Sequence, residues 1–186
     1  MGQLLTVGRN CWNIAPADDT GLLIDGCDYY RAFHDVCRNA QRTILICGWQ
    51  FDSDVSLLRG GGAEEGDDTR LLSFLNELCE KNNDLRIYIL AWNFNPVYGL
   101  EREWFQKWYF NWTTNERLKF CFDSCHCFGA SHHQKFVVID DKIAFVGGLD
   151  LCSSRWDERD HRVENPLRVN ADGSPYRSFH DLQSCH

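Results

Sequence analysis

Apolar runs with the length of buried strands alternate along this chain with segments that have the periodicity of amphipathic helices. Residues 43–49 (TILICGW) and 85–93 (LRIYILAWN) lack polar alternation, which is typical of strands buried on both faces. Shorter strands are predicted at residues 22–25, 118–122, 133–140 and 142–147. Apolar positions recur at helical spacing in residues 26–41, 68–82 and 101–112. The alternation predicts an α/β fold, with a layered mixed β-sheet flanked by helices.

Length and charge restrict the function classes. A chain of 186 residues with 44% hydrophobic residues has enough apolar material for one domain with its own core. Acidic residues exceed basic ones, 27 against 19, and the formal net charge is −8. A protein of this charge has no chain-wide basic surface for a long polyanion. Nucleic acid is therefore not expected as a partner, although a local basic pocket can still bind one phosphate group.

One stretch, SHHQKFVVIDDKIAFVGG at residues 131–148, carries an unusual set of polar residues around a predicted strand and its turn. Because side chains alternate along a strand, His133 and Lys135 are expected on the same side. An isolated H-x-K would be an edge strand with two solvated polar residues. Here the pattern continues to H-x-K-x4-D-x6-G-G through Asp140, Gly147 and Gly148, which is much rarer.

This pattern strongly resembles that of the phospholipase D superfamily. Similar stretches cover nearly the whole chain: LIDGCDYY (23–30), CGWQFDSD (47–54), LEREWF (100–105), GGLDL (147–151) and RWDERDH (155–161). The resemblance implies that residues 1–186 are a single catalytic lobe of a phospholipase D-like fold. The ending YRSFHDLQSCH lies within what resembles a strand, so we expect the lobe to be truncated near its C-terminal end.

The resemblance also implies roles for the motif residues. The family's motif histidine forms a phosphohistidine, a role that falls to His133, and neutral imidazole is both a nucleophile and a good leaving group near pH 7. Lys135 is expected to stabilise the negative charge that develops on the phosphoryl oxygens. Gly147 and Gly148 are expected to let the backbone come close to the phosphate. No metal ion or other cofactor is expected.

Asp140 has a different expected role. Its parity along the predicted strand is opposite to that of His133, so its carboxylate is expected to bond backbone or a buried cation. The carboxylate that orients His133 must then come from elsewhere. Asp181 in SFHDLQ resembles a family position after the motif, and Glu158 and Asp160 are the alternatives.

The residues after the glycine pair indicate the substrate. Nuclease and cardiolipin synthase relatives more often read G-S-x-N, whereas G-G-x-D-L with Asp150, followed by R-W-D, resembles the large phospholipases. We therefore expect a phosphodiester hydrolase or phosphatidyltransferase that acts on phospholipid headgroups, with Asp150 near the substrate. Trp49 and Asp52 follow a predicted buried strand and are expected to line the headgroup pocket. The alternative is that Trp49 packs in the core and Asp52 caps a loop.

The chain contains one such motif, whereas the family's active site uses two. The second is expected from a missing C-terminal lobe in preference to a homodimer partner, and a lone monomer is expected to be nearly inactive. Two alternatives remain: a single-motif homodimeric nuclease or cardiolipin-synthase-like transferase, and an inactive lipid-binding fragment.

Several features indicate a cytoplasmic protein that binds membranes peripherally. No apolar run reaches the roughly 18–20 residues of a membrane span, and the N-terminus lacks the pattern of a signal peptide. The ten cysteines are expected to be reduced thiols. The C-x3-C-x-C spacing of CFDSCHC (121–127) favours a plain loop over a zinc site. Trp104, Trp108 and Trp112 share one predicted helix face, which either packs on the sheet or lies at a membrane interface.

Overall fold

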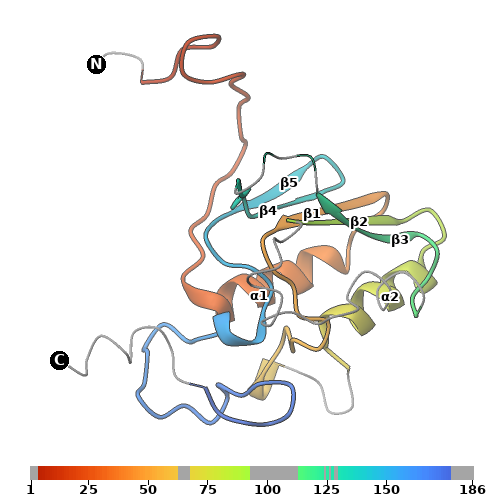
Figure 1. Cartoon of the computed structure of the whole chain (residues 1–186), viewed down its shortest axis with the longest axis vertical. Helices are drawn as coiled ribbons and strands as arrows, with labels where there is room; N and C mark the ends of the chain where they lie inside the picture. The colour runs from red at the N-terminus through yellow and green to blue at the C-terminus, as the bar shows by residue number, and fades with distance from the viewer. Residues whose placement is uncertain are drawn as a thin grey trace.

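A five-stranded mixed sheet forms the centre of the molecule (Figure 1). The computed structural model describes residues 4–62, 68–92, 113–123, 125, 127 and 130–176. The strand order is β3-β2-β1-β4-β5. The strands are β1 (Thr43–Gly48), β2 (Arg86–Trp92), β3 (Leu118–Asp123), β4 (Phe136–Ile139) and β5 (Ile143–Val146). The predicted α/β fold with a mixed sheet is confirmed.

The sheet combines parallel and antiparallel pairs. Strands β1, β2 and β3 are parallel, whereas β4 is antiparallel to both β1 and β5. The β4–β5 hairpin turns at Asp140 and Asp141, which have φ angles of 52° and 56°, and Lys142 N–H donates to the Ile139 carbonyl. Aspartate is among the few non-glycine residues that adopt this left-handed backbone readily. The predicted turn at these two residues is confirmed.

Two helices cover one face of the sheet, as Figure 1 shows. They are α1 (Asp25–Cys37) and α2 (Leu71–Lys81), shorter than the predicted segments 26–41 and 68–82. Their apolar stripes pack with inward-facing strand residues into one buried core, which includes Tyr30, Phe33, Leu75, Ile87 and Phe120. Two short 3-10 turns also occur, η1 (Gly60–Gly62) and η3 (Ser153–Arg155).

Two predictions about the sheet were wrong. Residues 22–24 precede α1 without pairing in the sheet, and Leu22 is 82% exposed. The strands predicted as buried on both faces are covered on one face only by the described residues, because Leu45, Tyr88 and Leu90 are 37–43% exposed on the other. The predicted helix 101–112 lies outside the described residues. In the part of the chain that is described, no helix has the length and apolar character needed to cross a membrane.

Candidate active site

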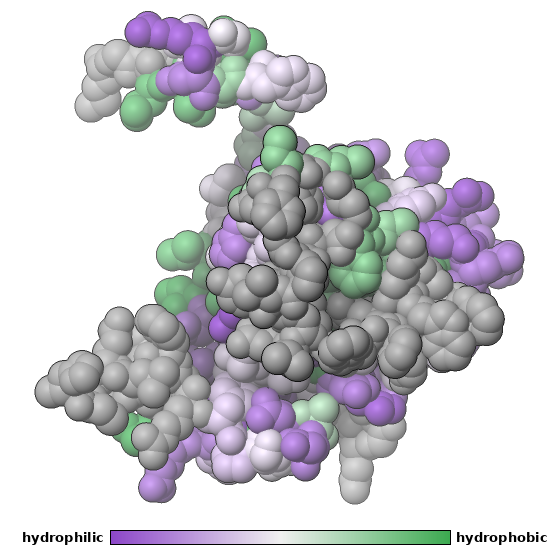
Figure 2. All heavy atoms as spheres, viewed as in Figure 1, coloured by the Kyte–Doolittle hydropathy of each residue, from purple (hydrophilic) through white to green (hydrophobic). Residues whose placement is uncertain are grey.

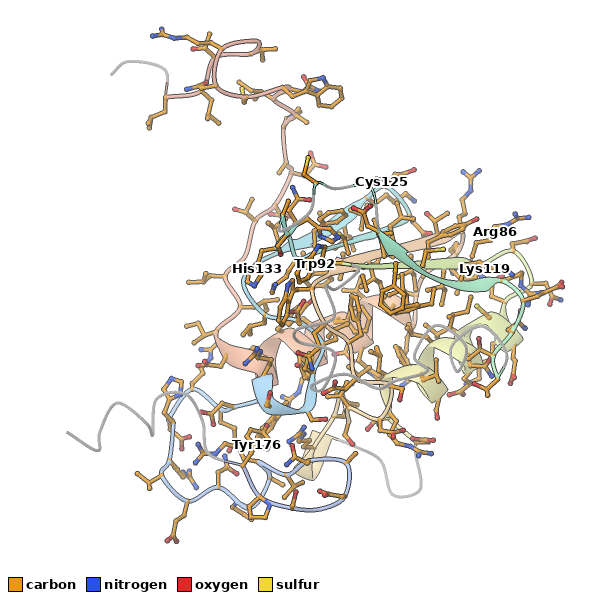
Figure 3. The ribbon with its side chains drawn as sticks, in the orientation of Figure 1. Arg86, Trp92, Lys119, Cys125, His133 and Tyr176 are labelled. Atoms are coloured by element: carbon orange, nitrogen blue, oxygen red, sulfur yellow. The ribbon has the colours of Figure 1, made fainter. Side chains whose placement is uncertain are left out.

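His133 and Lys135 lie at the end of the sheet that contains the C-terminal ends of the parallel strands. Both residues precede β4, so the predicted strand 133–140 begins only at Phe136. Phe136 pairs with Cys47 near the end of β1, which brings the motif to the C-terminal ends of β1 and β2. Figure 3 shows His133 beside Trp92 at this end, with Arg86 and Lys119 at the opposite end. Ligands usually bind at the C-terminal ends of parallel strands in open α/β sheets.

The two motif side chains differ in exposure. His133 is exposed, whereas Lys135 is 7% exposed and its Nζ reaches back to the His133 carbonyl at 3.4 Å. Strand alternation therefore does not describe the pair, because the residues lie in the extended segment before the strand. The arrangement leaves the His133 side chain accessible and holds the Lys135 ammonium group near the His133 backbone.

A buried ion pair fixes Lys135. Its Nζ lies 3.1 Å from Oδ2 of Asp150, and the two side chains are 6% and 1% exposed. The other carboxylate oxygen of Asp150 accepts the backbone N–H of Trp49 at 2.8 Å. Asp150 was predicted to bind substrate, but its carboxylate is engaged by protein groups on both oxygens. It therefore positions Lys135 and Trp49.

Hydrogen bonds from helix α1 hold the loop that carries Asp150 in place. The Tyr30 hydroxyl lies 2.9 Å from the carbonyl of Asp150 and 2.7 Å from that of Cys152. Gly48 permits the close approach of the loop, because a Cβ at this position would lie 2.8 Å from Asp150 Oδ1 and 2.6 Å from Phe51. Contacts from helix α1 and from the end of β1 therefore fix the position of Asp150 and, through it, of the ion pair.

Two tryptophans form an aromatic wall beside His133. Trp49 stacks on Trp92 with ring centroids 5.8 Å apart and an interplanar angle of 17°. The Trp49 ring also lies 5.7 Å from the His133 ring, at 55°. Trp49 is half-buried rather than fully packed in the core. Trp49 therefore lies beside His133, its role in lining the headgroup pocket stays a prediction, and Trp92 is a neighbour that the sequence analysis missed.

Asp140 lies at the far end of β4 and bonds backbone, as predicted. Its carboxylate accepts N–H groups of Gln41, Arg42 and Thr43 at 2.7, 2.8 and 2.9 Å. Burial by itself raises the pKa of this carboxyl, but the hydrogen bonds from Thr43, Gln41 and Arg42 outweigh it and hold the pKa below its usual value. Asp140 thus ties the hairpin to the chain that enters β1.

The remaining candidate residues lie in different surroundings. Asp52 accepts the N–H of Ser153 at 2.8 Å, which is the loop-capping alternative for this residue. Glu158 and Asp160 bond Asn165 and Arg162, respectively, and no bond of theirs to His133 is found in the described residues. Asp181 lies outside the described residues. Apart from its own chain neighbours, no atom of the described residues lies within 4 Å of a Cβ added at Gly147 or at Gly148. The protein's own packing therefore leaves this wall free for a ligand.

The two cysteine thiols near the site, Cys152 and Cys47, have raised pKa values. Burial raises the pKa of the Cys152 thiol well above its usual value, with further increases from Asp52 and Asp150. Burial, with Asp123 and Asp150, also raises the pKa of Cys47. Both thiols therefore stay protonated near neutral pH. Within the described residues, no group of three or more His, Cys, Asp or Glu side chains is arranged to hold a metal ion.

This geometry is suited to covalent phosphoryl chemistry. The imidazole of His133 is exposed, the ammonium group of Lys135 is held by Asp150 and by the His133 carbonyl, and Gly147 and Gly148 line a pocket together with Lys135. A lysine ammonium has three N–H donors, and its contacts to Asp150 and the His133 carbonyl use two of them. The third is available for a phosphoryl oxygen in the described part of the chain.

Comparison with known proteins gives a consistent result. The family model described as "Phospholipase D" matches residues 36–180. Phospholipase D C of Dictyostelium discoideum is 31% identical over 166 residues, which cover 87% of this chain and 10% of that protein. Phospholipase D1 of Saccharomyces cerevisiae is 29% identical over 172 residues, 86% of this chain and 10% of the yeast protein. Phospholipase D zeta 1 of Arabidopsis thaliana is 30% identical over 164 residues. The chain spans 10–14% of the length of these relatives.

Proposed function

Because the chain belongs to the phospholipase D family, we propose that it supplies one half of an active site that cleaves the headgroup from phospholipids through a phosphohistidine at His133. The observation that carries this proposal is the buried Lys135–Asp150 pair, 3.1 Å between Nζ and Oδ2, whose ammonium group also lies 3.4 Å from the backbone carbonyl of the exposed His133. A buried lysine is costly unless it is paired. Its position in a pocket lined by Gly147 and Gly148 supports a role in binding a phosphate.

In the proposed reaction, a nitrogen of His133 attacks phosphorus and the P–O bond to the headgroup alcohol breaks. The developing charge on the phosphoryl oxygens is stabilised by the free N–H of Lys135. A proton must reach the leaving alcohol, and a second motif histidine supplies it. The same group then takes a proton from water or an acceptor alcohol, which displaces His133 and releases phosphatidate or a new phosphatidyl ester.

The second motif comes from outside the described residues, either from a further lobe or from a second copy of this chain. Removing a general acid or base typically lowers the rate by roughly 10²- to 10⁴-fold. The chain alone, as a monomer, is therefore expected to be nearly inactive. The complete enzyme is expected to act at a membrane surface as a peripheral protein.

The phospholipid assignment is preferred to a nuclease for two reasons. The net charge of −8 disfavours a long polyanion, and the three relatives compared above are all called phospholipase D. The proposal also makes the chain an active half-site rather than an inactive lipid-binding module, because His133 and Lys135 are both present and Lys135 shares a pocket with Gly147 and Gly148.

The test is release of headgroup by the assembled enzyme, meaning this chain together with whatever supplies the second motif. Phosphatidylcholine and phosphatidylethanolamine vesicles are compared with a single-stranded oligonucleotide as substrates. Headgroup release that is lost in His133→Asn supports the proposal. Cleavage of the oligonucleotide with no headgroup release would replace it with the nuclease alternative.

A further inference from the structure

A short arm of the chain stands away from the sheet and its helices. We define the arm as residues 4–20, which lead into the segment before α1. In Figure 1 the arm, in red, rises past β5 and lies clear of the rest of the molecule. Every hydrogen bond found for residues 4–14 in the described part of the chain joins two residues of the arm itself.

The side chains that the arm exposes include five large apolar ones. They are Leu4 (90% exposed), Leu5 (51%), Val7 (53%), Trp12 (91%) and Ile14 (46%). Figure 2 shows hydrophobic residues, in green, on the surface of the arm at the top of the view. A single exposed apolar side chain is normal, but so many in one short segment form a patch of the kind that binds a membrane or another protein.

The charge of the arm is opposite in sign to that of the whole chain. Residues 4–17 contain no Asp or Glu, and Arg9 is their one charged residue, whereas the chain has a net charge of −8. Tryptophan is favoured at the boundary between lipid headgroups and acyl chains, and an arginine beside it can place its cation among the headgroups. A second copy of this chain, with its acidic surface and no lipid, offers no such boundary.

The backbone of the turn in the arm is hydrogen-bonded internally. The N–H groups of Arg9 and Asn10 both donate to the Thr6 carbonyl at 3.1 Å. The Asn10 side chain closes the turn, because its Oδ1 accepts the Thr6 N–H at 2.7 Å and its Nδ2 donates to the Leu4 carbonyl at 2.9 Å. Unpaired backbone groups are costly away from water, so a turn that pairs its own groups is suited to the interface of a bilayer. Docking by addition of a strand to a protein sheet needs those groups unpaired.

The arm joins the body of the protein beside the candidate active site. Gly21 and Leu22, which follow the arm, line a pocket together with Lys135. A surface that is bound by the arm therefore lies near the motif residues.

We propose that the arm is a membrane-docking segment, whose apolar side chains enter the interfacial region of a bilayer while Arg9 stays at the headgroups. The inference rests on the proposed function for the lipid substrate, and it adds the segment that holds this lobe at the membrane surface. Insertion to the ~5–10 Å that is typical of interfacial segments is enough to cover the exposed side chains.

The test measures co-sedimentation of the complete 186-residue chain with vesicles of phosphatidylcholine, alone or mixed with phosphatidylglycerol. Trp12→Asp and Leu4→Asp are each expected to weaken binding at least about tenfold, which corresponds to loss of roughly two buried methylenes. Arg9→Gln is expected to weaken binding about fivefold, and only to the vesicles with phosphatidylglycerol. Val163→Asp is the matched control, because Val163 is 76% exposed and lies outside the arm. It should bind like wild type, and all four variants should melt like wild type.

A second measurement locates the arm in the bilayer. Phosphatidylcholine with brominated acyl chains is expected to quench the tryptophan fluorescence of the bound wild type. Trp12→Phe keeps an apolar side chain, so it is expected to bind as wild type does and to show less quenching. Undiminished quenching in Trp12→Phe would mean that Trp12 does not enter the bilayer, which overturns the inference.

Three results of the binding experiment also overturn it: no vesicle binding by wild type, binding that Trp12→Asp leaves unchanged, or an equal loss in Val163→Asp. Sedimentation of wild type as a dimer that Trp12→Asp dissociates, without vesicle binding, would assign the arm to a second copy instead. Headgroup release from a soluble short-chain phosphatidylcholine by the assembled enzyme tests the proposed function separately. Release combined with vesicle binding that does not depend on the arm rejects only the arm assignment. Arm-dependent vesicle binding with no release rejects only the proposed function.

Discussion

Nζ of Lys135 lies 3.1 Å from Oδ2 of Asp150, and the two side chains are almost completely buried. The pair joins the residue just before β4 to the loop after β5, and it also reaches Trp49 through the second oxygen of Asp150. Among the described residues, neither Lys135 nor Asp150 forms a second ion pair. The position of the Lys135 ammonium group and the compensation of its charge therefore depend on its contact with Asp150.

Removing one member of this pair is predicted to destabilise the fold. Asp150→Leu leaves the Lys135 ammonium buried without its partner, at an expected cost of about 3–5 kcal/mol in the free energy of unfolding. The double variant Lys135→Met/Asp150→Leu is expected to recover most of that loss, because no buried charge remains. Urea denaturation measures both. A single variant as stable as wild type would show that the pair is not buried in solution.

The same double variant separates stability from activity. The assembled enzyme that carries it is expected to fold and to show no headgroup release, since no cation is left for the phosphoryl oxygens. Substantial turnover by the double variant would remove Lys135 from the mechanism.

Asp140 is predicted to give a pH-dependent contribution to stability. Because its pKa is held below the usual 3.8, its ionised form stabilises the folded state above that pH, and the contribution is lost as the pH falls below it. Asp140→Asn is therefore expected to lower the melting temperature at pH 7, and the difference from wild type should shrink at acidic pH. Asp141→Asn, on the exposed neighbouring turn residue, is the control and should melt like wild type at both pH values.

The chemical step is predicted to proceed without a divalent cation. In the proposed mechanism Lys135 supplies the positive charge that Mg²⁺ or Zn²⁺ supplies in other phosphodiesterases. Hydrolysis of a soluble short-chain phosphatidylcholine by the assembled enzyme should persist in EDTA. Loss of this activity, restored by one specific metal ion, would contradict the prediction. An effect of the ion on vesicle binding alone would not.

Much of the fold could be predicted from local patterns. The apolar runs and amphipathic stripes gave β1, α2, β2 and β3 within a few residues, because periodicity reports which face of an element is buried. Residues 22–25 were misassigned, since a short apolar run has the composition of a strand whether or not a partner strand lies beside it. Pairing between distant segments is not encoded in a local pattern.

The candidate site was predictable in part. The motif spacing singled out His133 and Lys135, and Asp140 bonds backbone as expected, although the strand parity used to argue this does not extend back to His133. The Lys135–Asp150 contact was missed because it depends on the conformation of the loop after β5. That conformation is set by Tyr30 and Gly48, which are far from the loop in sequence.

The central claim is that His133 becomes covalently bound to phosphorus, and trapping that intermediate tests it most directly. The assembled enzyme is incubated with phosphatidylcholine labelled in the phosphate, and the reaction is quenched at alkaline pH, at which a phosphohistidine is stable. Its peptides are then analysed by mass spectrometry. The account predicts an acid-labile label on His133 in wild type and in the neighbouring control His132→Asn. It predicts no label, no turnover and a near-normal melting temperature for His133→Asn, since this side chain is exposed. A labelled residue other than His133, or turnover by His133→Asn above a few per cent of wild type, would contradict the account.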